Sequence, residues 1–210
     1  MNRTPETNGR VRILGVDPAA AGPTGYGIVE RVGRTCNALR FGALRIAAND
    51  QKESPGAALQ KVHALLCRLI EEFSPAAVAV ESVFTALNIR TALRLAEVRG
   101  VILLAAAQNS VPCYSYSPRE VKASVTGYGQ ADKRQMQRMV RALLSLPQIP
   151  EPPDAADALA VALCHLQAQN LRNCLGLPET GAGPKSRRLG AAVSSPGVAP
   201  LHLSRIELIR

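Results

Sequence analysis

The sequence predicts an α/β domain in which a mixed five-stranded β-sheet is flanked by α-helices. In the second half of the chain, strand-like and helix-like segments alternate, which is typical of βαβ units. Earlier, three strand-like segments follow one another, and the short link 32–34 predicts an antiparallel hairpin. A hairpin followed by βαβ units predicts a sheet that contains both antiparallel and parallel strands.

The first half of the chain is expected to hold four strands and one helix. We place the strands over 12–16, 25–31, 35–46 and 76–80. Before the last of them, Ser54 and Pro55 supply an N-cap and a proline at the first helical position. Apolar residues then recur at helical spacing, and Pro75 ends this helix.

The second half adds one strand and four helices. We expect the helices over 86–108, 118–125, 131–145 and 153–169, and the strand over 111–115. The second half of the first of these helices is apolar nearly all round. Such a helix must be covered on two sides, by its own sheet and, we expect, by a second subunit.

Composition narrows the class of protein. The chain has 210 residues and a formal net charge of +9, which favours a polyanionic partner. The first residues lack the apolar stretch of a signal peptide, and the longest strongly apolar run, 101–107, is too short to span a bilayer. We therefore expect a cytoplasmic protein without membrane association. The five cysteines form no CxxC pair, so neither a zinc site nor a disulfide framework is expected.

The chain is expected to divide into three parts. Residues 1–10 read as a flexible N-terminus and residues 11–173 as the folded domain. Residues 174–210 are rich in Gly, Pro, Ser and Arg, which predicts a mostly disordered basic tail.

Four acidic residues stand where strands end or a helix begins. Asp17 ends the first strand and Glu81 ends the fourth, while Asp154 and Asp157 lie three residues apart at the start of the last helix. If that helix crosses the strand ends, the four carboxylates converge and repel one another, unless a divalent cation such as Mg²⁺ compensates them. Two such ions can promote hydrolysis of a phosphodiester. Taken singly, each acid has a simpler reading, as a turn residue or a helix N-terminal acid.

Four segments resemble the characteristic blocks of the RuvC family of bacterial Holliday junction resolvases. They are "ILGVDPAAAGPTGYG", "VAVESVF", "YSPREVKASVTGYGQADKRQM" and "PDAADALAVALCH", in the family's order across residues 11–169. The resemblance implies a ribonuclease-H-like fold, a homodimer and paired nicking of four-way DNA junctions during recombination and repair. It also implies two Mg²⁺ ions per subunit, with Mn²⁺ as a substitute, and cooperation with the RuvA–RuvB branch-migration complex.

The same resemblance assigns roles to individual residues. The family's catalytic metal ligands correspond to Asp17, Glu81, Asp154 and Asp157. Phe84 corresponds to an aromatic residue that stacks on DNA near the crossover, and the alternative is a core phenylalanine. The positions expected to face DNA are Lys122 and Lys133, with Arg119 as a possible extension of the phosphate-binding surface; the alternative is that they are only solvated.

Two features lie outside these assignments. Ala19 stands where the family usually has glycine, and the loop from Asp17 to Thr24 is one residue longer than usual. His165 lies about 16 Å along the helix from Asp154, which favours a structural histidine over a ligand.

Three other functions remain open from the sequence. The glycine-rich first loop superficially resembles the phosphate loop of actin-like ATPases and sugar kinases, although those enzymes need two such domains and ATP binding would identify them. A catalytically silent junction-binding protein is disfavoured by the four intact acids. The third alternative is a relative that acts on RNA or on single strands. Paired nicking of a synthetic four-way junction would distinguish the resolvase from it.

Overall fold

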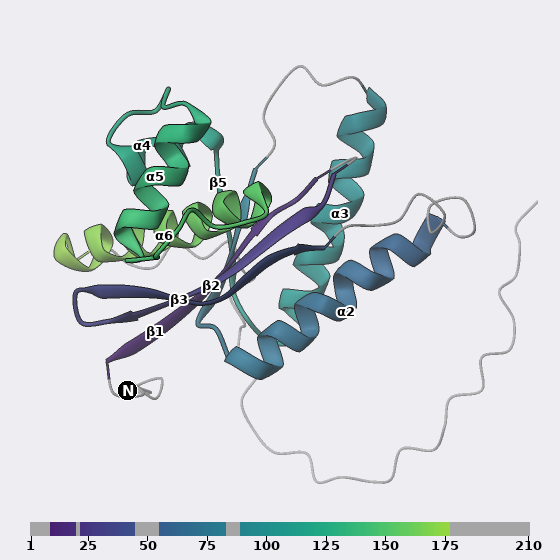
Figure 1. Cartoon of the computed structure of the whole chain (residues 1–210). Coiled ribbons are helices and arrows are strands. Elements are labelled where there is room, and N and C mark those ends of the chain that lie inside the picture. The colour runs from purple at the N-terminus through teal and green to yellow at the C-terminus, as the bar shows by residue number, and fades with distance from the viewer. Residues whose placement is uncertain (1–8, 20–21, 45–54, 83–88, 177–210) are drawn as a thin grey trace, which may run out of the picture.

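A computed structural model of the chain describes residues 9–19, 22–44, 55–82 and 89–176. The expected order of strands and helices is confirmed (Figure 1). The strands are β1 (Arg10–Asp17), β2 (Thr24–Val32), β3 (Thr35–Leu44), β4 (Ala77–Glu81) and β5 (Cys113–Tyr116). The helices are α2 (Pro55–Phe73), α3 (Ile89–Gln108), α4 (Pro118–Thr126), α5 (Lys133–Leu143) and α6 (Pro153–Cys174).

Several boundaries differ from the sequence prediction, among them those of α5, β5 and α6. Helix α5 begins after Asp132 and not at 131, because the Asp132 side chain caps the helix by accepting from the backbone N–H of Gln135. Strand β5 begins two residues later than expected. Helix α6 continues past 169 to Cys174 and is followed by Gly176 in the left-handed conformation, with φ of 64°.

The five strands form one mixed sheet in the order β3-β2-β1-β4-β5. The pairs β1–β2 and β2–β3 are antiparallel, whereas β1–β4 and β4–β5 are parallel. Helices α2 and α3 cover one face of the sheet, and α6 lies across the other with α4 and α5 packed beyond it (Figure 1). The predicted fold class is therefore confirmed.

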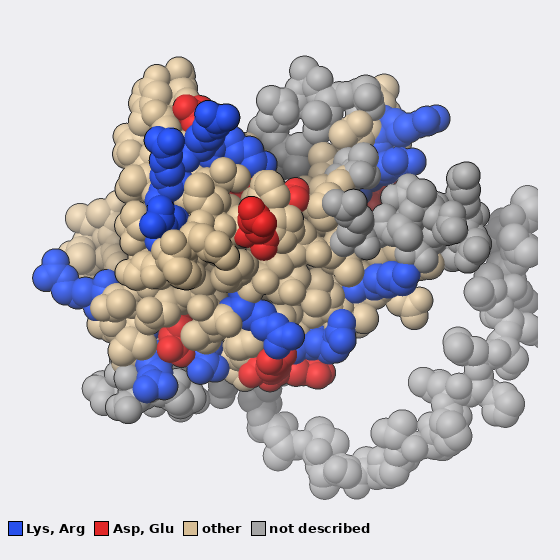
Figure 2. Space-filling view, in the orientation of Figure 1, with Lys and Arg blue, Asp and Glu red and all other residues tan. Residues whose placement is uncertain are grey.

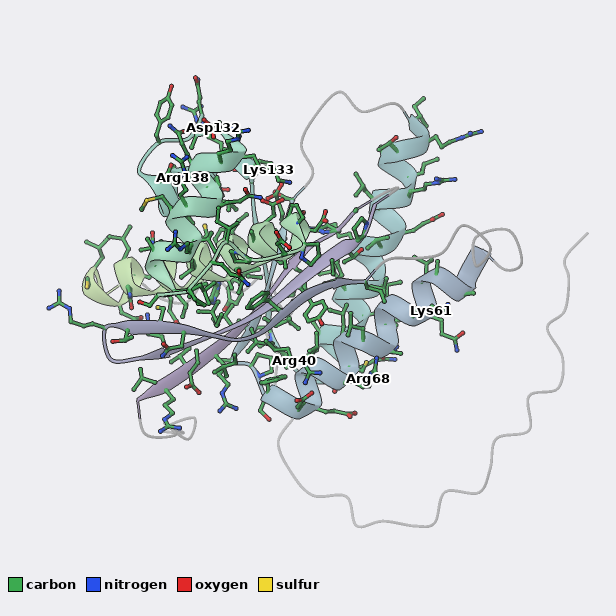
Figure 3. The ribbon with its side chains drawn as sticks, viewed as in Figure 1. Arg40, Lys61, Arg68, Asp132, Lys133 and Arg138 are labelled. Carbon is green, nitrogen blue, oxygen red and sulfur yellow. The ribbon has the colours of Figure 1, made fainter. Side chains whose placement is uncertain are left out.

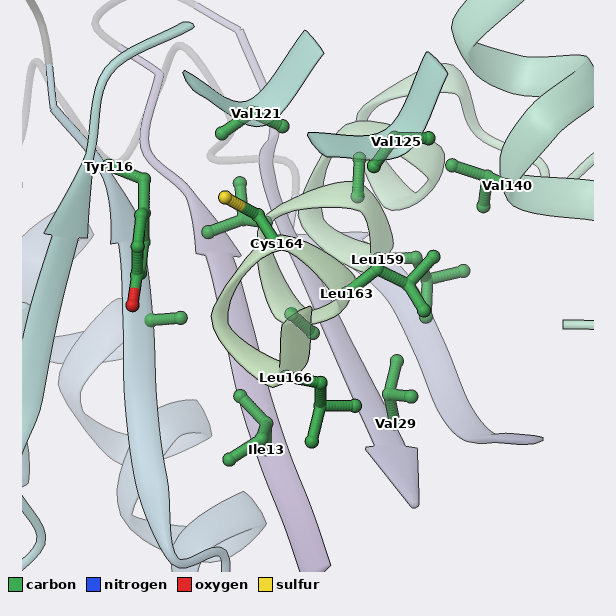
Figure 4. Close-up of a cluster of buried hydrophobic side chains, with 14 of the residues drawn as sticks. Ile13, Val29, Tyr116, Val121, Val125, Val140, Leu159, Leu163, Cys164 and Leu166 are labelled. Carbon is green, nitrogen blue, oxygen red and sulfur yellow. The ribbon is translucent and has the colours of Figure 1, made fainter. Parts of the chain in front are cut away.

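The two faces of the sheet carry side chains of different size. Toward α2 and α3 the central strands present large apolar side chains: Leu14, Val16, Ile28, Val78 and Val80. Toward α6, Gly15, Gly25, Gly27, Ala77 and Ala79 occupy the same three strands. The core on this side is completed by larger residues from the strands' other ends and from α6 itself, such as Ile13, Val29 and Leu159 (Figure 4).

Helix α3 has one buried and one exposed apolar side. Val98 and Ile102 are buried against the sheet and α2, as expected. Leu93 and Leu104 on the outer side are 61% and 51% exposed. This side of α3 has no cover within the described part of the chain.

Helices α4 and α5 form a small unit on top of α6. Each begins with a capping box, made by Ser117 and Glu120 in α4 and by Asp132 and Gln135 in α5. Their buried residues, among them Val121, pack on α6. Two helix starts are thereby fixed beside the end of the sheet that carries the acids.

Two expectations from composition can be compared with the described residues. None of the helices in the described ranges is both long and apolar enough to cross a membrane. All five cysteines are free. Cys164 is buried and Cys36, Cys67 and Cys113 are half-buried, so these four contribute to packing, whereas Cys174 is exposed.

Candidate active site

Two carboxylates stand at the same end of two neighbouring strands. Asp17 is the last residue of β1 and Glu81 the last residue of β4. The strands run parallel with Val16 opposite Val80, so Asp17 and Glu81 come side by side at this edge of the sheet. Strand alternation turns both toward the face covered by α6.

Two more carboxylates come from the start of α6. Pro153 begins this helix, and Asp154 and Asp157 follow within its first turns, both half-buried. The backbone of Asp154 lies directly against Gly25, the residue paired with Asp17 across β1 and β2. The fold thus brings the four predicted acids to one end of the sheet.

Three of these acids line a cavity of about 230 Å³. Asp17, Glu81 and Asp157 line it together with Lys122 and Lys133. The remaining wall is apolar and comes from α4 and α5: Pro118, Val121 and Met136. Asp154 is not part of this wall, although its charge acts on Asp17.

Burial and mutual repulsion raise the pKa values of the two strand-end acids. The pKa of Asp17 rises from 3.8 to about 8, mainly because the group is buried and further because Glu81, Asp157 and Asp154 are close. The pKa of Glu81 rises from 4.5 to about 7, again through burial first and then through Asp157. The protein alone therefore leaves negative charge here incompletely balanced.

Lys133 supplies part of the balance. Its Nζ donates to Oδ2 of Asp157 at 2.9 Å, and this hydrogen bond raises the pKa of the lysine. Lys122 opposes the rise in the pKa of Glu81. Both lysines therefore act on the acids as well as facing the cavity.

The residues present fit a hard divalent cation. Carboxylate oxygens are the donors that Mg²⁺ prefers, and the raised pKa values of Asp17 and Glu81 mark a place where positive charge is needed. Over the described ranges, however, no three His, Cys, Asp or Glu side chains are grouped so that they could by themselves hold a metal ion. A cation bound here needs other ligands in addition, and Mg²⁺ usually keeps several waters.

The basic residues expected to face DNA lie on α4 and α5. Figure 2 shows lysine and arginine side chains over these helices, next to acidic side chains near the centre of the view. Lys122 and Lys133 line the cavity, whereas Arg119 is exposed and lies outside its wall. Figure 3 places Arg138 on the same unit as Lys133, and Arg138 is also exposed.

Several predictions fall partly or wholly outside the described residues, among them the flexible N-terminus 1–10 and the disordered tail 174–210. Phe84 lies in the range 83–88, which the structure does not describe. In the first loop, Ala19 is described and half-buried, but residues 20–21 are not. The stacking role of Phe84 and the path of the longer loop stay predictions.

His165 is a structural residue, as expected. It is 4% exposed, its Nδ1 lies 2.7 Å from the hydroxyl of Tyr116, and its ring packs on Tyr114. Burial lowers the pKa of His165 to about 4, with Arg172 and Arg31 contributing further. It does not line the cavity.

The apolar wall and the contact at Gly25 were missed from the sequence. Val121 and Met136 look like ordinary core residues on amphipathic helices, and only the docking of α4 and α5 places them at the cavity. The alternation of Gly25 with Gly27 along a strand could have indicated that something packs closely on that face. That the packed group is the backbone of Asp154 follows only from the position of α6.

Comparisons with known proteins agree with this geometry. The family model described as crossover junction endodeoxyribonuclease RuvC matches residues 13–165. A RuvC from Natranaerobius thermophilus is 47% identical over 163 residues, covering 78% of this chain and 99% of the relative. A RuvC from Moorella thermoacetica is 49% identical over 154 residues, covering 73% of this chain and 89% of the relative.

Solved structures give the same result. The structure of Thermus thermophilus RuvC in complex with a Holliday junction substrate matches with a TM-score of 0.70 and 31% identity, over 77% of this chain and 96% of that one. The yeast mitochondrial Holliday junction resolvase Ydc2 matches with a TM-score of 0.55 at 15% identity, over 79% of this chain and 83% of that one. The second likeness concerns the fold alone.

Proposed function

The chain belongs to the RuvC family of crossover junction endodeoxyribonucleases, and on this basis we propose that it resolves four-way (Holliday) DNA junctions by paired nicks. Its role is in homologous recombination and DNA repair. The observation that carries the proposal is the pair Asp17 and Glu81, held side by side with raised pKa values in a cavity that two lysines line. A binding module without catalysis has no need to bury two such carboxylates.

The nuclease reaction depends on a metal, and we assign its ligands to Asp17, Glu81, Asp154 and Asp157. Mg²⁺ is the expected ion, with two ions per subunit and Mn²⁺ as a substitute; the donor set and the unbalanced negative charge support this choice. When bound, divalent metal stabilises the negative charge that develops on a phosphodiester under attack. The chain itself holds the acids rigidly on two strands and one helix.

Lysine side chains complete the site toward DNA. Lys133 holds Asp157 through its 2.9 Å hydrogen bond, and Lys122 offsets the charge of Glu81. Both face a cavity in which a phosphate would lie, and Arg119 extends the basic surface outward. Phe84 is assigned to stacking on a base at the crossover, which the aromatic ring favours for any base.

We further assign the exposed side of α3 to a homodimer interface. Leu93 and Leu104 are exposed apolar side chains on one side of this helix, and paired nicks need two sites related by a two-fold axis. Cooperation with RuvA–RuvB and a cytoplasmic location belong to the same proposal. Residues 11–173 would then suffice for folding and catalysis, with 174–210 as a dispensable tail.

Incubation with a synthetic four-way junction tests the proposal. Wild-type protein with Mg²⁺ is expected to make symmetry-related nicks whose ends can be ligated. Asp17→Asn is expected to bind the junction without cutting it, and Glu71→Gln, at an exposed acid on α2, serves as the matched control. Junction left intact by folded wild-type protein, or equal cutting of unbranched RNA or single strands, would overturn it.

A further inference from the structure

Helix α6 lies unusually close to the sheet. At Gly15, an added Cβ would lie 2.1 Å from the carbonyl oxygen of Ala158, and at Gly27 it would lie 2.7 Å from a Leu159 side-chain carbon. Separations below 3.0 Å are essentially never found for real Cβ atoms. The helix can therefore approach this closely only where the strands carry glycine.

The tightest of these contacts is at the active site. A Cβ at Gly25 would lie 2.0 Å from the carbonyl oxygen of Asp154 and 2.6 Å from its carbonyl carbon. Gly25 is also the residue that pairs with Asp17 across β1 and β2. One residue of β2 thus contacts the backbone of one proposed metal ligand and pairs with another.

The atom that Gly25 meets decides what a substitution would do. At Gly27 the two nearest atoms belong to the side chain of Leu159, at 2.7 and 2.9 Å, and the nearest backbone atom, the nitrogen of Leu159, is farther away at 3.2 Å. At Gly25 the nearest atoms are backbone of the first turn of α6, so room can be made only by moving that turn. Such a movement carries the Asp154 carboxylate with it.

We propose that Gly25 is a positioning residue of the metal site, which sets the distance between the start of α6 and the end of β1. Without a side chain at 25, the carboxylates of Asp154 and Asp157 are brought within reach of the ion that Asp17 and Glu81 hold. The proposal rests on the function proposed above. In this role Gly25 contacts neither DNA nor metal, and it acts only by setting the position of α6.

The test compares Gly25→Ala with Gly27→Ala, the same substitution on the same strand and face. Mn²⁺ binding to each protein without DNA is measured by electron paramagnetic resonance titration, together with thermal unfolding and junction binding in EDTA. Gly25→Ala is expected to weaken Mn²⁺ binding about 10- to 100-fold, the range usual for residues that orient metal ligands. Its junction binding in EDTA should stay near wild type, and Gly27→Ala should retain wild-type Mn²⁺ affinity.

A compensating change sharpens the result. Asp154→Glu lengthens the side chain by one methylene, so it should recover part of the Mn²⁺ affinity in the Gly25→Ala background while lowering it in wild type. Wild-type Mn²⁺ affinity in folded Gly25→Ala, or a Gly25→Ala protein that does not fold, would overturn the proposal. Failure of wild type to cut junctions would instead count against the function, since Mn²⁺ binding is measured without DNA.

Discussion

The two faces of the central sheet use the same three strands for opposite purposes. Toward α2 and α3, residues such as Leu14 and Val80 fill the interior with large side chains. Toward α6, Gly15 and Gly25 leave the strands bare, so that a helix backbone can lie on them. The first face gains stability from burial, whereas the second exchanges side-chain packing for close placement of carboxylates.

The largest expected effect is a loss of junction cleavage when an acid on the α6 face is replaced. Asp17→Asn should lower junction cleavage by about 10²- to 10³-fold, because the metal's stabilisation is worth several kcal/mol and each ~1.4 kcal/mol is tenfold. Fold and junction binding should survive. Single-turnover cleavage and gel-shift assays check this, and near wild-type cutting would remove Asp17 from the ligand set.

A substitution on the face covered by α2 and α3 should lower the stability of the fold without changing cleavage. Leu66 on α2 is 2% exposed among the large side chains of that face, so Leu66→Ala should lower the free energy of unfolding by about 2–5 kcal/mol. At a temperature where the variant remains folded, its cleavage rate should match wild type. Denaturant unfolding measures the first effect, and a specific loss of metal affinity would show that the faces are not independent.

The pH dependence of stability in EDTA should come from the α6 face. Between about pH 4 and pH 8, folded protein keeps a proton on Asp17 that the unfolded chain has lost, so this group destabilises the fold as pH rises, and the raised pKa of Glu81 acts in the same direction. The lowered pKa of His165 acts in the opposite direction over the lower part of this range and offsets part of the effect. The melting temperature should fall by a few degrees across this range. Asp17→Asn should flatten the curve, and Mg²⁺ should raise the melting temperature more at pH 8 than at pH 5; a curve unchanged by Asp17→Asn would contradict the burial argument.

The smallest expected effects distinguish Lys133, which lines the cavity, from Arg119, which lies outside its wall. Lys133→Gln removes the partner of Asp157, so it should slow cleavage of bound junction about 10-fold. Arg119→Gln should mainly weaken binding at low salt and reduce the salt slope by about one. Binding isotherms at several salt concentrations, with single-turnover rates, separate the two; equal effects on both readouts would show one continuous phosphate surface.

The sequence predicted the acids better than their surroundings. Asp17 and Glu81 could be found because each closes an apolar strand, a local pattern that fixes their place in the sheet. The ion pair of Lys133 with Asp157 could not, because it depends on how α5 docks on α6. Residues close in space but distant in the chain become visible only when the packing is known.

The ends of the helices were also harder to predict from the sequence than the helices themselves. Asp132 was placed inside a helix, but its side chain caps that helix from outside. Helix α6 was expected to end at Gln169, yet its stop signal is Gly176 in the left-handed region. Cap geometry, and not apolar periodicity, sets these ends.

Helix α6 both closes the site and contacts every strand, and it follows all five strands along the chain, so it is synthesised after them. A ribosome must complete and release residues up to the first turns of α6 before Asp154 and Asp157 can join Asp17 and Glu81. Until then the nascent chain has a sheet that α6 does not cover and only two of the four proposed metal ligands, and we expect it not to cut DNA. The proposed metal site can therefore be complete only after α6 has been synthesised and has packed on the sheet.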